Sequence, residues 1–306
     1  MSKTLVNKLH SLTGHNHSIY ALAEGSDPRF IYTGAGDGMV VEWDLDAPKD
    51  GKVLAKLPNS VYALTVDKTR NWLFVGHNFE GIHVIDLQTR KEIWSLRITD
   101  QSIFDIQVYG DQLFIGTGGG VIVVVDIGEG AVVKHLKVSD ASIRVFSLLK
   151  GGNQLAVGSS DHTIKIFRLP EWEPLNLISG HTNSVFALSY SPDGRYLLSG
   201  GRDATLKVWE VDSYQESTSI IAHMYALNFI SFREDGKYFV TCSMDKTLKI
   251  WDANTFTLLK VIDKARHAGH GTSINKVLWS SYGQQIIAIS DDRTVSVWDI
   301  NFEGNY

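Results

Sequence analysis

Four residue types that could support hydrolysis recur together in this sequence. In the segment 180–211 they are His181, Ser199, Asp203 and Trp209, and the interval from the histidine to the tryptophan is 28 residues. A hydroxyl, an imidazole and a carboxylate brought together form the triad that activates a serine for acyl transfer. A hydrolytic site is therefore the first hypothesis that these residues raise.

The number of copies argues against catalysis. The same interval recurs in three further sets, which are His15, Thr33, Asp37 and Trp43; His223, Thr241, Asp245 and Trp251; and His270, Asp292 and Trp298. An enzyme needs its triad once, and the sequence has no Gly-x-Ser-x-Gly nucleophile motif. We interpret the sets as structural and expect no catalytic residue. Ala288 stands at the hydroxyl position of the last set, so its network is expected to be incomplete.

Short strands are predicted to position these residues. The segment 180–211 contains an alternating run from Val185, a turn at Ser191-Pro192-Asp193-Gly194, and two further strands at 196–200 and 205–210. Proline and glycine at these turn positions favour a tight reversal. Three short strands with turns between them predict an antiparallel meander, and its recurrence predicts a repeat protein.

The repeat resembles the WD-repeat family. The residues that carry the resemblance are Gly180-His181, Asp203 and Trp209, with literal Trp-Asp pairs at Trp43-Asp44, Trp251-Asp252 and Trp298-Asp299. The resemblance implies a β-propeller, in which each blade is a four-stranded antiparallel sheet around a central channel. It also implies that each His, hydroxyl, Asp and Trp set is a hydrogen-bonded structural network, since a half-buried Trp N–H needs an acceptor.

The length predicts seven blades. Repeats of about 40–45 residues fill the 306 residues with one all-β propeller spanning 1–306 and no second domain. Blades two to four depart from the pattern, with Leu57, Thr99 and Ser139 at the histidine position. The chain ends soon after Trp298-Asp299, so residues 4–12 are expected to complete blade seven as its outer strand and close the ring.

Composition excludes several classes of function. There are 29 basic and 34 acidic residues, a formal net charge of −5, so we expect no nucleic-acid-binding face. The single cysteine, Cys242, excludes an internal disulfide and favours a reducing compartment. No secretion signal is recognised, and the longest apolar run, 121–125, is too short for a bilayer. We expect a cytoplasmic protein without membrane association, a nuclear location remaining open.

Other chemistry-bearing residues have simpler interpretations. His267 lies near His270, and His15 near His17, but no cysteine or carboxylate cluster accompanies them, so no metal is expected. The glycine run at 116–120 has neither a following Lys-Ser/Thr nor a helix, so it is interpreted as a hairpin rather than a phosphate loop, and no cofactor is expected.

One ring of positions suggests binding. The residue five after each histidine, or its equivalent, opens the inner strand of a blade, where family members commonly dock partners. These positions hold Tyr20, Tyr62, Phe104, Arg144, Phe186, Asn228 and Asn275, and the residues before the turn aspartate on the same face include Arg202, Met244 and Asn78. Aromatic residues and arginine are enriched at binding hot spots.

The leading hypothesis is a non-enzymatic scaffold that docks a protein or peptide on the narrow rim of the propeller, as a monomer or as a subunit of a larger complex. The bound segment could be acidic or phosphorylated, carry a methylated lysine held by the aromatic residues, or be unmodified. Blades two to four could form a second interface. The alternative is a propeller enzyme of the hydrolase or lactonase type, for which Asp105 and Glu24 are the nearest channel candidates.

Overall fold

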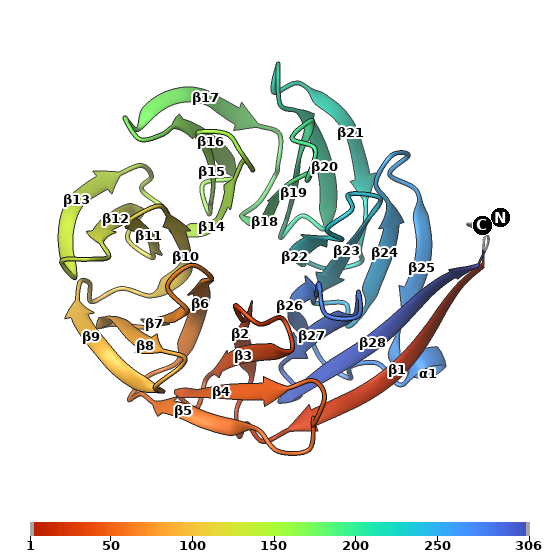
Figure 1. Ribbon diagram of the computed structural model, residues 1–306. Helices are drawn as coiled ribbons and strands as arrows, with labels where there is room; N and C mark the ends of the chain where they lie inside the picture. Colours follow the sequence, from red (N-terminus) through yellow and green to blue (C-terminus); the bar gives the residue numbers. More distant parts are fainter. Residues whose placement is uncertain (1–2, 304–306) are drawn as a thin grey trace.

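A ring of seven four-stranded antiparallel sheets makes up nearly all of the computed structural model, which describes residues 3–303 (Figure 1). In each sheet, or blade, four strands lie side by side from the central channel to the outside. The prediction of an all-β, seven-bladed propeller is confirmed. Residues 1–2 and 304–306 of the predicted span lie outside the described residues.

The strand bounds show the same four-strand unit in every blade. Blade one contains β2 (Ile19–Glu24), β3 (Phe30–Ala35), β4 (Met39–Asp44) and β5 (Lys52–Lys56). Blade two contains β6 (Val61–Asp67), β7 (Trp72–His77), β8 (Gly81–Asp86) and β9 (Lys91–Arg97). Blade three contains β10 (Ile103–Tyr109), β11 (Gln112–Thr117), β12 (Val121–Asp126) and β13 (Ala131–Lys137). Blade four contains β14 (Ile143–Leu148), β15 (Gln154–Ser159), β16 (Thr163–Arg168) and β17 (Glu173–Ser179).

The remaining three blades include the most regular repeats. Blade five contains β18 (Val185–Tyr190), β19 (Tyr196–Gly201), β20 (Thr205–Glu210) and β21 (Glu216–Ile221). Blade six contains β22 (Leu227–Phe232), β23 (Tyr238–Ser243), β24 (Leu248–Asp252) and β25 (Leu258–Ile262). Blade seven contains β26 (Ile274–Trp279), β27 (Ile286–Ser290), β28 (Thr294–Glu303) and, from the other end of the chain, β1 (Lys3–Thr13).

The two ends of the chain share blade seven. Strand β1 lies outermost in the order β1-β28-β27-β26, antiparallel to β28, with Leu12 opposite Val295 and Val6 opposite Ile300. In Figure 1 the red β1 runs beside the blue β28. The first strand therefore occupies the outer position that the last repeat does not fill with its own residues.

The apolar core lies between neighbouring blades. One cluster joins Leu12, Ile289 and Val295 of blade seven to Ile19 and Trp43 of blade one, and similar clusters follow around the ring. Burying a face of each sheet against the next is the main source of stability in such a repeat.

The blades approach most closely near the channel. A Cβ atom on Gly34, near the end of β3, would lie 2.4 Å from Cγ1 of Val61 in the next blade. Gly76, Gly116, Gly158 and Gly200 occupy the same strand position, and each would also bring a Cβ within 3.0 Å of an inner-strand side chain. Glycine at these positions lets the inner strands lie close enough to line one channel.

One short helix interrupts the sheets. Helix α1 (Lys264–His267) precedes His270, and the Asp263 carboxylate caps it by accepting a hydrogen bond from the backbone N–H of Arg266. The sequence does not predict this helix, because four residues are too few to show a helical period. Within the described range 3–303, no helix is both long and apolar enough to cross a membrane.

Candidate functional site: the channel mouth

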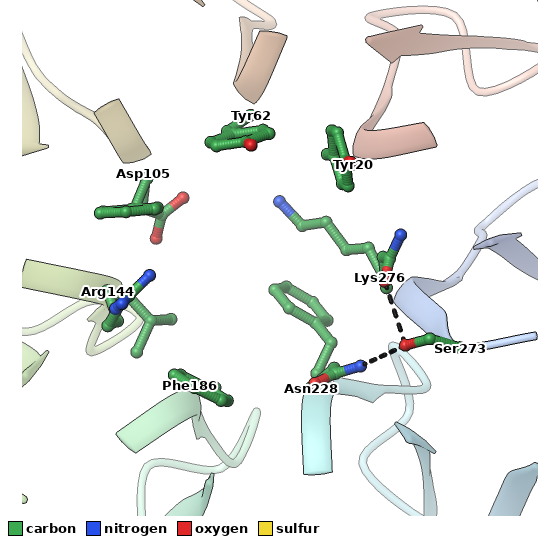
Figure 2. A pocket seen from close by; sticks show the side chains of 12 residues that line it. Tyr20, Tyr62, Asp105, Arg144, Phe186, Asn228, Ser273 and Lys276 are labelled. Atoms are coloured by element: carbon green, nitrogen blue, oxygen red, sulfur yellow. Dashed lines mark hydrogen bonds between the residues drawn. The ribbon is translucent and has the colours of Figure 1, made fainter. Parts of the chain in front are cut away.

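The seven predicted rim positions lie around one cavity. A hollow of about 390 Å³ at the channel mouth is lined by all of Tyr20, Tyr62, Phe104, Arg144, Phe186, Asn228 and Asn275 (Figure 2). Phe229, Lys276, Asp105, Val145 and Ser273 complete the lining. Each blade thus contributes the second residue of its inner strand to a common site.

A β-bulge aims each of these side chains. In blade one the pairing of β2 with β3 shifts register between Ile19 and Ala21, so Tyr20 between them has no partner across the ladder. The same shift falls at the equivalent residue of all seven blades. An unpaired bulge residue is turned away from the regular alternation of the strand, which is how bulges re-aim side chains at binding sites. The sequence predicted which residues face the channel mouth but did not predict the bulge that orients them.

The aromatic residues form a packed arc. The rings of Tyr20 and Tyr62 meet edge to face at 4.6 Å between centroids, and Tyr62 stacks on Phe104 at 6.1 Å with an interplanar angle of 10°. Both geometries are favourable for aromatic pairs. All three side chains are half-buried, so the arc offers a preformed apolar surface that needs little reordering on binding.

Arg144 continues the arc as a cation. Its guanidinium lies 4.0 Å from the ring centroid of Phe104 and 5.5 Å from that of Phe186, and its Nε donates to Ser160 Oγ at 2.8 Å. Burial lowers the pKa of Arg144, and the nearby positive charge of Arg202 lowers it further. No Asp or Glu within residues 3–303 pairs with Arg144. The cavity therefore contains a partly desolvated cation without an acidic partner.

Lys276 and Asp105 face the same cavity from opposite sides (Figure 2). The Lys276 ammonium lies 4.8 Å from the ring centroid of Phe229. Asp105 accepts backbone hydrogen bonds from Phe146 N at 2.8 Å and from Ile106 N at 3.1 Å. Burial raises the pKa of the Asp105 carboxyl, while the charge of Lys276 opposes that rise. Asp105 thus ties blade three to blade four, and its oxygens are already used by backbone donors.

Glu24, the other channel candidate for an enzyme, does not line this cavity. Its carboxylate accepts from Lys68 Nζ at 2.8 Å, from Ser280 Oγ at 2.8 Å and from Ser281 N at 2.9 Å. These contacts join blade one to blades two and seven. Asp105 and Glu24 are therefore not brought together as a pair of acidic groups.

Two of the predicted binding residues also hold the ring together. Asn228 Nδ2 donates to Ile274 O at 2.8 Å, from blade six to blade seven. Asn275 Nδ2 donates to Ile19 O and to Asp291 Oδ1, both at 2.8 Å, and the first of these bonds joins blade seven to blade one. Asn78 is buried and accepts from Ile103 N at 2.9 Å. The side-chain amides of these three residues, as donors in Asn228 and Asn275 and as an acceptor in Asn78, therefore hold neighbouring blades together.

The His, hydroxyl, Asp and Trp sets form buried hydrogen-bond networks. In blade five, Trp209 Nε1 donates to Ser199 Oγ at 2.8 Å, His181 Nε2 lies 2.7 Å from the same oxygen, and His181 Nδ1 lies 2.9 Å from Asp203. Equivalent bonds join His15, Thr33, Asp37 and Trp43 in blade one, and His223, Thr241, Asp245 and Trp251 in blade six. Ser199 has no exposed surface, so a substrate could not reach this hydroxyl.

The expectation of an incomplete network in blade seven is wrong. His270 Nε2 lies 2.7 Å from Ser296 Oγ, and Trp298 Nε1 donates to that oxygen at 2.8 Å. Ser296 on β28 stands directly opposite Ala288 on β27. The serine therefore supplies the hydroxyl from the facing strand, and the small alanine leaves room for it. His270 Nδ1 completes the network at 2.9 Å from Asp292.

Four segments match the family described as WD domain, G-beta repeat: residues 6–44, 172–210, 215–252 and 262–299, together about half of the sequence. The chain belongs to the WD40 family. No curated protein matches the sequence. WD40 propellers are generally non-enzymatic scaffolds that bind protein partners, and this is the functional class that the match supports.

A second hollow adjoins the first on this WD40 propeller. It measures about 580 Å³ and includes the predicted residues Arg202 and Met244, together with Met224, Tyr225, Phe186 and Asn228. Phe186 and Asn228 line both hollows, which therefore lie side by side. Sequence reasoning missed Met224 and Tyr225. The available signal was the apolar pair directly after His223, where the other three histidines are followed by Asn16-His17, Thr182-Asn183 and Gly271-Thr272.

Proposed function

We propose that this WD40 propeller is a non-enzymatic scaffold that docks a partner protein at the channel mouth. The observation that carries the proposal is Arg144, a half-buried cation stacked between Phe104 and Phe186 with no acidic partner in residues 3–303. A desolvated arginine beside preformed aromatic surface is the type of group that dominates binding energy at protein interfaces.

The geometry argues against a cage for methylated lysine. A cationic ligand would need open aromatic faces, but the Arg144 guanidinium lies over Phe104, and the edge-to-face contact of Tyr20 with Tyr62 occupies another face. Such a ligand would also meet the positive charges of Arg144 and Lys276 in the same cavity. Like charges in a partly desolvated site are costly to bring together, so a neutral or acidic segment is the better fit.

The test is affinity capture from a lysate of the source organism, followed by identification of the captured proteins. The bait is compared with a Tyr62→Ala/Phe104→Ala/Arg144→Ala/Phe186→Ala variant shown by circular dichroism and thermal melting to be folded. The matched control is Val53→Ala/Val133→Ala/Leu177→Ala, which truncates exposed apolar side chains on the outer strands β5, β13 and β17.

A partner bound by wild type and control but lost from the channel-mouth variant is the expected result. A partner retained by the channel-mouth variant and lost from the control would contradict the proposal and place binding on the outer edges of the blades. Turnover of a substrate by the purified protein, abolished by Asp105→Asn, would instead support the enzyme alternative.

A further inference from the structure

Blade six presents an apolar patch beside the channel mouth. Met224 is 82 % exposed, Tyr225 is 61 % exposed and Met244 is 55 % exposed. The first two lie in the loop before β22, and Met244 lies in the turn between β23 and β24. Exposed apolar side chains gathered around a hollow mark interaction sites, and methionine adapts its shape to a bound apolar group.

Blade six differs here from its neighbours. The position of Met244 is occupied by Arg202 in blade five and by Asp291 in blade seven. Within residues 3–303 the side chains of Met224 and Tyr225 make no hydrogen bond, and only their backbones bind the blade, at Asp245 and Ser243. The patch is therefore additional to what the blade needs for folding.

Positive charge lies at the edge of the same hollow. Arg202 lines it and is exposed, and within residues 3–303 it has no Asp or Glu partner. The adjacent Asp203 is unavailable, because its carboxylate accepts from His181 at 2.9 Å and from Thr205 Oγ1 at 2.7 Å. Arg202 also lies near enough to Arg144 to lower the pKa of that guanidinium.

We infer that the propeller binds one linear acidic segment of a partner protein at two adjoining subsites, with a carboxylate held by Arg144 and Arg202 and a large apolar side chain held by Met224, Tyr225 and Met244. The two hollows share Phe186 and Asn228, so a single extended chain can occupy both. A carboxylate would relieve the repulsion between the two arginines and match their planar donor geometry.

This inference rests on the proposed function and gives the chemistry of its ligand. Among the described residues, only Arg144, Arg202 and Lys276 bring positive charge to the two hollows, and the formal net charge is −5. An extended polyanion such as a nucleic acid therefore lacks the basic track that its backbone needs. A short peptide with one acidic and one apolar side chain can place the first at the two arginines and the second at the apolar patch of blade six.

The test is selection of short random peptides displayed on phage. Selections are run on wild type, on Arg144→Gln/Arg202→Gln and on Met224→Ser/Met244→Ser. The matched controls are Arg97→Gln, an exposed arginine on β9, and Leu177→Ser, an exposed leucine on β17. Because Arg144 contacts several groups, the single exposed substitution Arg202→Gln is carried in parallel, and every variant must keep the wild-type melting temperature.

We expect wild-type and control selections to enrich peptides with Asp or Glu close to a Leu, Ile, Met or Phe. The arginine variants should lose the acidic preference and the methionine variant the apolar one. For a selected peptide measured by fluorescence anisotropy, Arg202→Gln should weaken binding about tenfold, the loss typical of one charge-assisted hydrogen bond. Replacing the acidic residue by phosphoserine tests whether a phosphate serves equally well.

The possible results distinguish failure of the two-subsite inference from failure of the channel-mouth scaffold. Peptides that depend on Tyr62 and Phe104 but ignore Arg202, Met224 and Met244 would overturn the two-subsite inference while leaving the channel-mouth scaffold intact. Failure of wild type to enrich any sequence would count against both. A dimer in light scattering that Met224→Ser abolishes would show that a second copy of the chain covers the patch, which also overturns the inference.

Discussion

The hydroxyl that joins histidine to tryptophan comes from two different strands in this ring. Blades one, five and six use Thr33, Ser199 and Thr241 on the second strand of the blade, whereas blade seven uses Ser296 on the third. The network depends on where the oxygen lies between the imidazole and the indole. It does not depend on which strand carries the oxygen.

Replacing Ser296 tests this interpretation. Ser296→Ala would leave both His270 Nε2 and Trp298 Nε1 buried without their partner, at a cost of about 1–3 kcal/mol in the free energy of unfolding. Adding Ala288→Ser should recover much of that loss, because residue 288 faces residue 296 across the ladder. Urea denaturation of the single and double variants measures both effects, and an unchanged midpoint for Ser296→Ala would contradict the network.

The carboxylates of these networks predict acid sensitivity. Hydrogen bonds from His223 and Thr247 outweigh burial and lower the pKa of Asp245, and those from His270 and Thr294 do the same for Asp292. A carboxyl whose pKa is lower in the folded state stabilises the protein above its unfolded value of about 4, and this stabilisation is lost as the pH falls below it. Burial also lowers the pKa of His223. The unfolded chain therefore takes up a proton at this histidine more readily than the folded protein, and stability decreases as the pH falls below about 6.5.

Asp245→Asn isolates part of this effect. The variant should be less stable than wild type at neutral pH, and its stability should decline less steeply below about pH 4, because one fewer group takes up a proton on unfolding. Thermal melts across the acid range measure the slope. Parallel curves for the two proteins would show that Asp245 does not carry the predicted linkage.

At the scale of the element, β1 is the strand with the most distant partner in sequence. It covers the edge of β28, and Leu12 adds to the cluster that joins blade seven to blade one. Deleting residues 1–13 would expose that edge and unpack the junction, so we expect a large fall in melting temperature and association through the free strand. Scanning calorimetry and light scattering measure these two consequences.

A rearranged chain provides the control. Lys3 pairs with Glu303, so a hairpin loop joining the two chain ends, with a new start at Gly14, places β1 directly after β28. This permutant should recover the stability lost by the deletion. Failure of the deletion to change the melting curve would show that β1 contributes little to closing the ring.

The sequence predicted the elements well where spacing carried the information. The constant interval from histidine to tryptophan located blades one, five, six and seven, and strand and turn spacing extended the pattern through blades two to four. Contacts between strands were harder to predict from the sequence. The oxygen of Ser296 and the bulge that aims Tyr20 depend on ladder register, which residue types do not specify at a given position.

At the scale of the whole molecule, the closed ring brings the bulge residues of seven blades together around one cavity. No single blade could build the cavity, because each contributes one bulge residue, and glycines such as Gly34 let neighbouring blades approach closely. All seven bulge residues, which the sequence grouped as one set, line this cavity. The sequence could not show that Arg144 lacks an acidic partner among residues 3–303, or that the patch of blade six lines a second hollow beside the first, because both facts depend on contacts between blades.

Site-directed photo-cross-linking shows whether a partner occupies the channel mouth. A photoreactive phenylalanine analogue is placed at Phe186, which lines both hollows, and separately at Leu177 on the outer strand β17. We predict cross-links to one partner from position 186 alone, and mass spectrometry should find the attachment in a segment containing acidic and apolar residues. Cross-linking from position 177 with none from position 186 would show that the partner binds the outer strands and not the channel mouth.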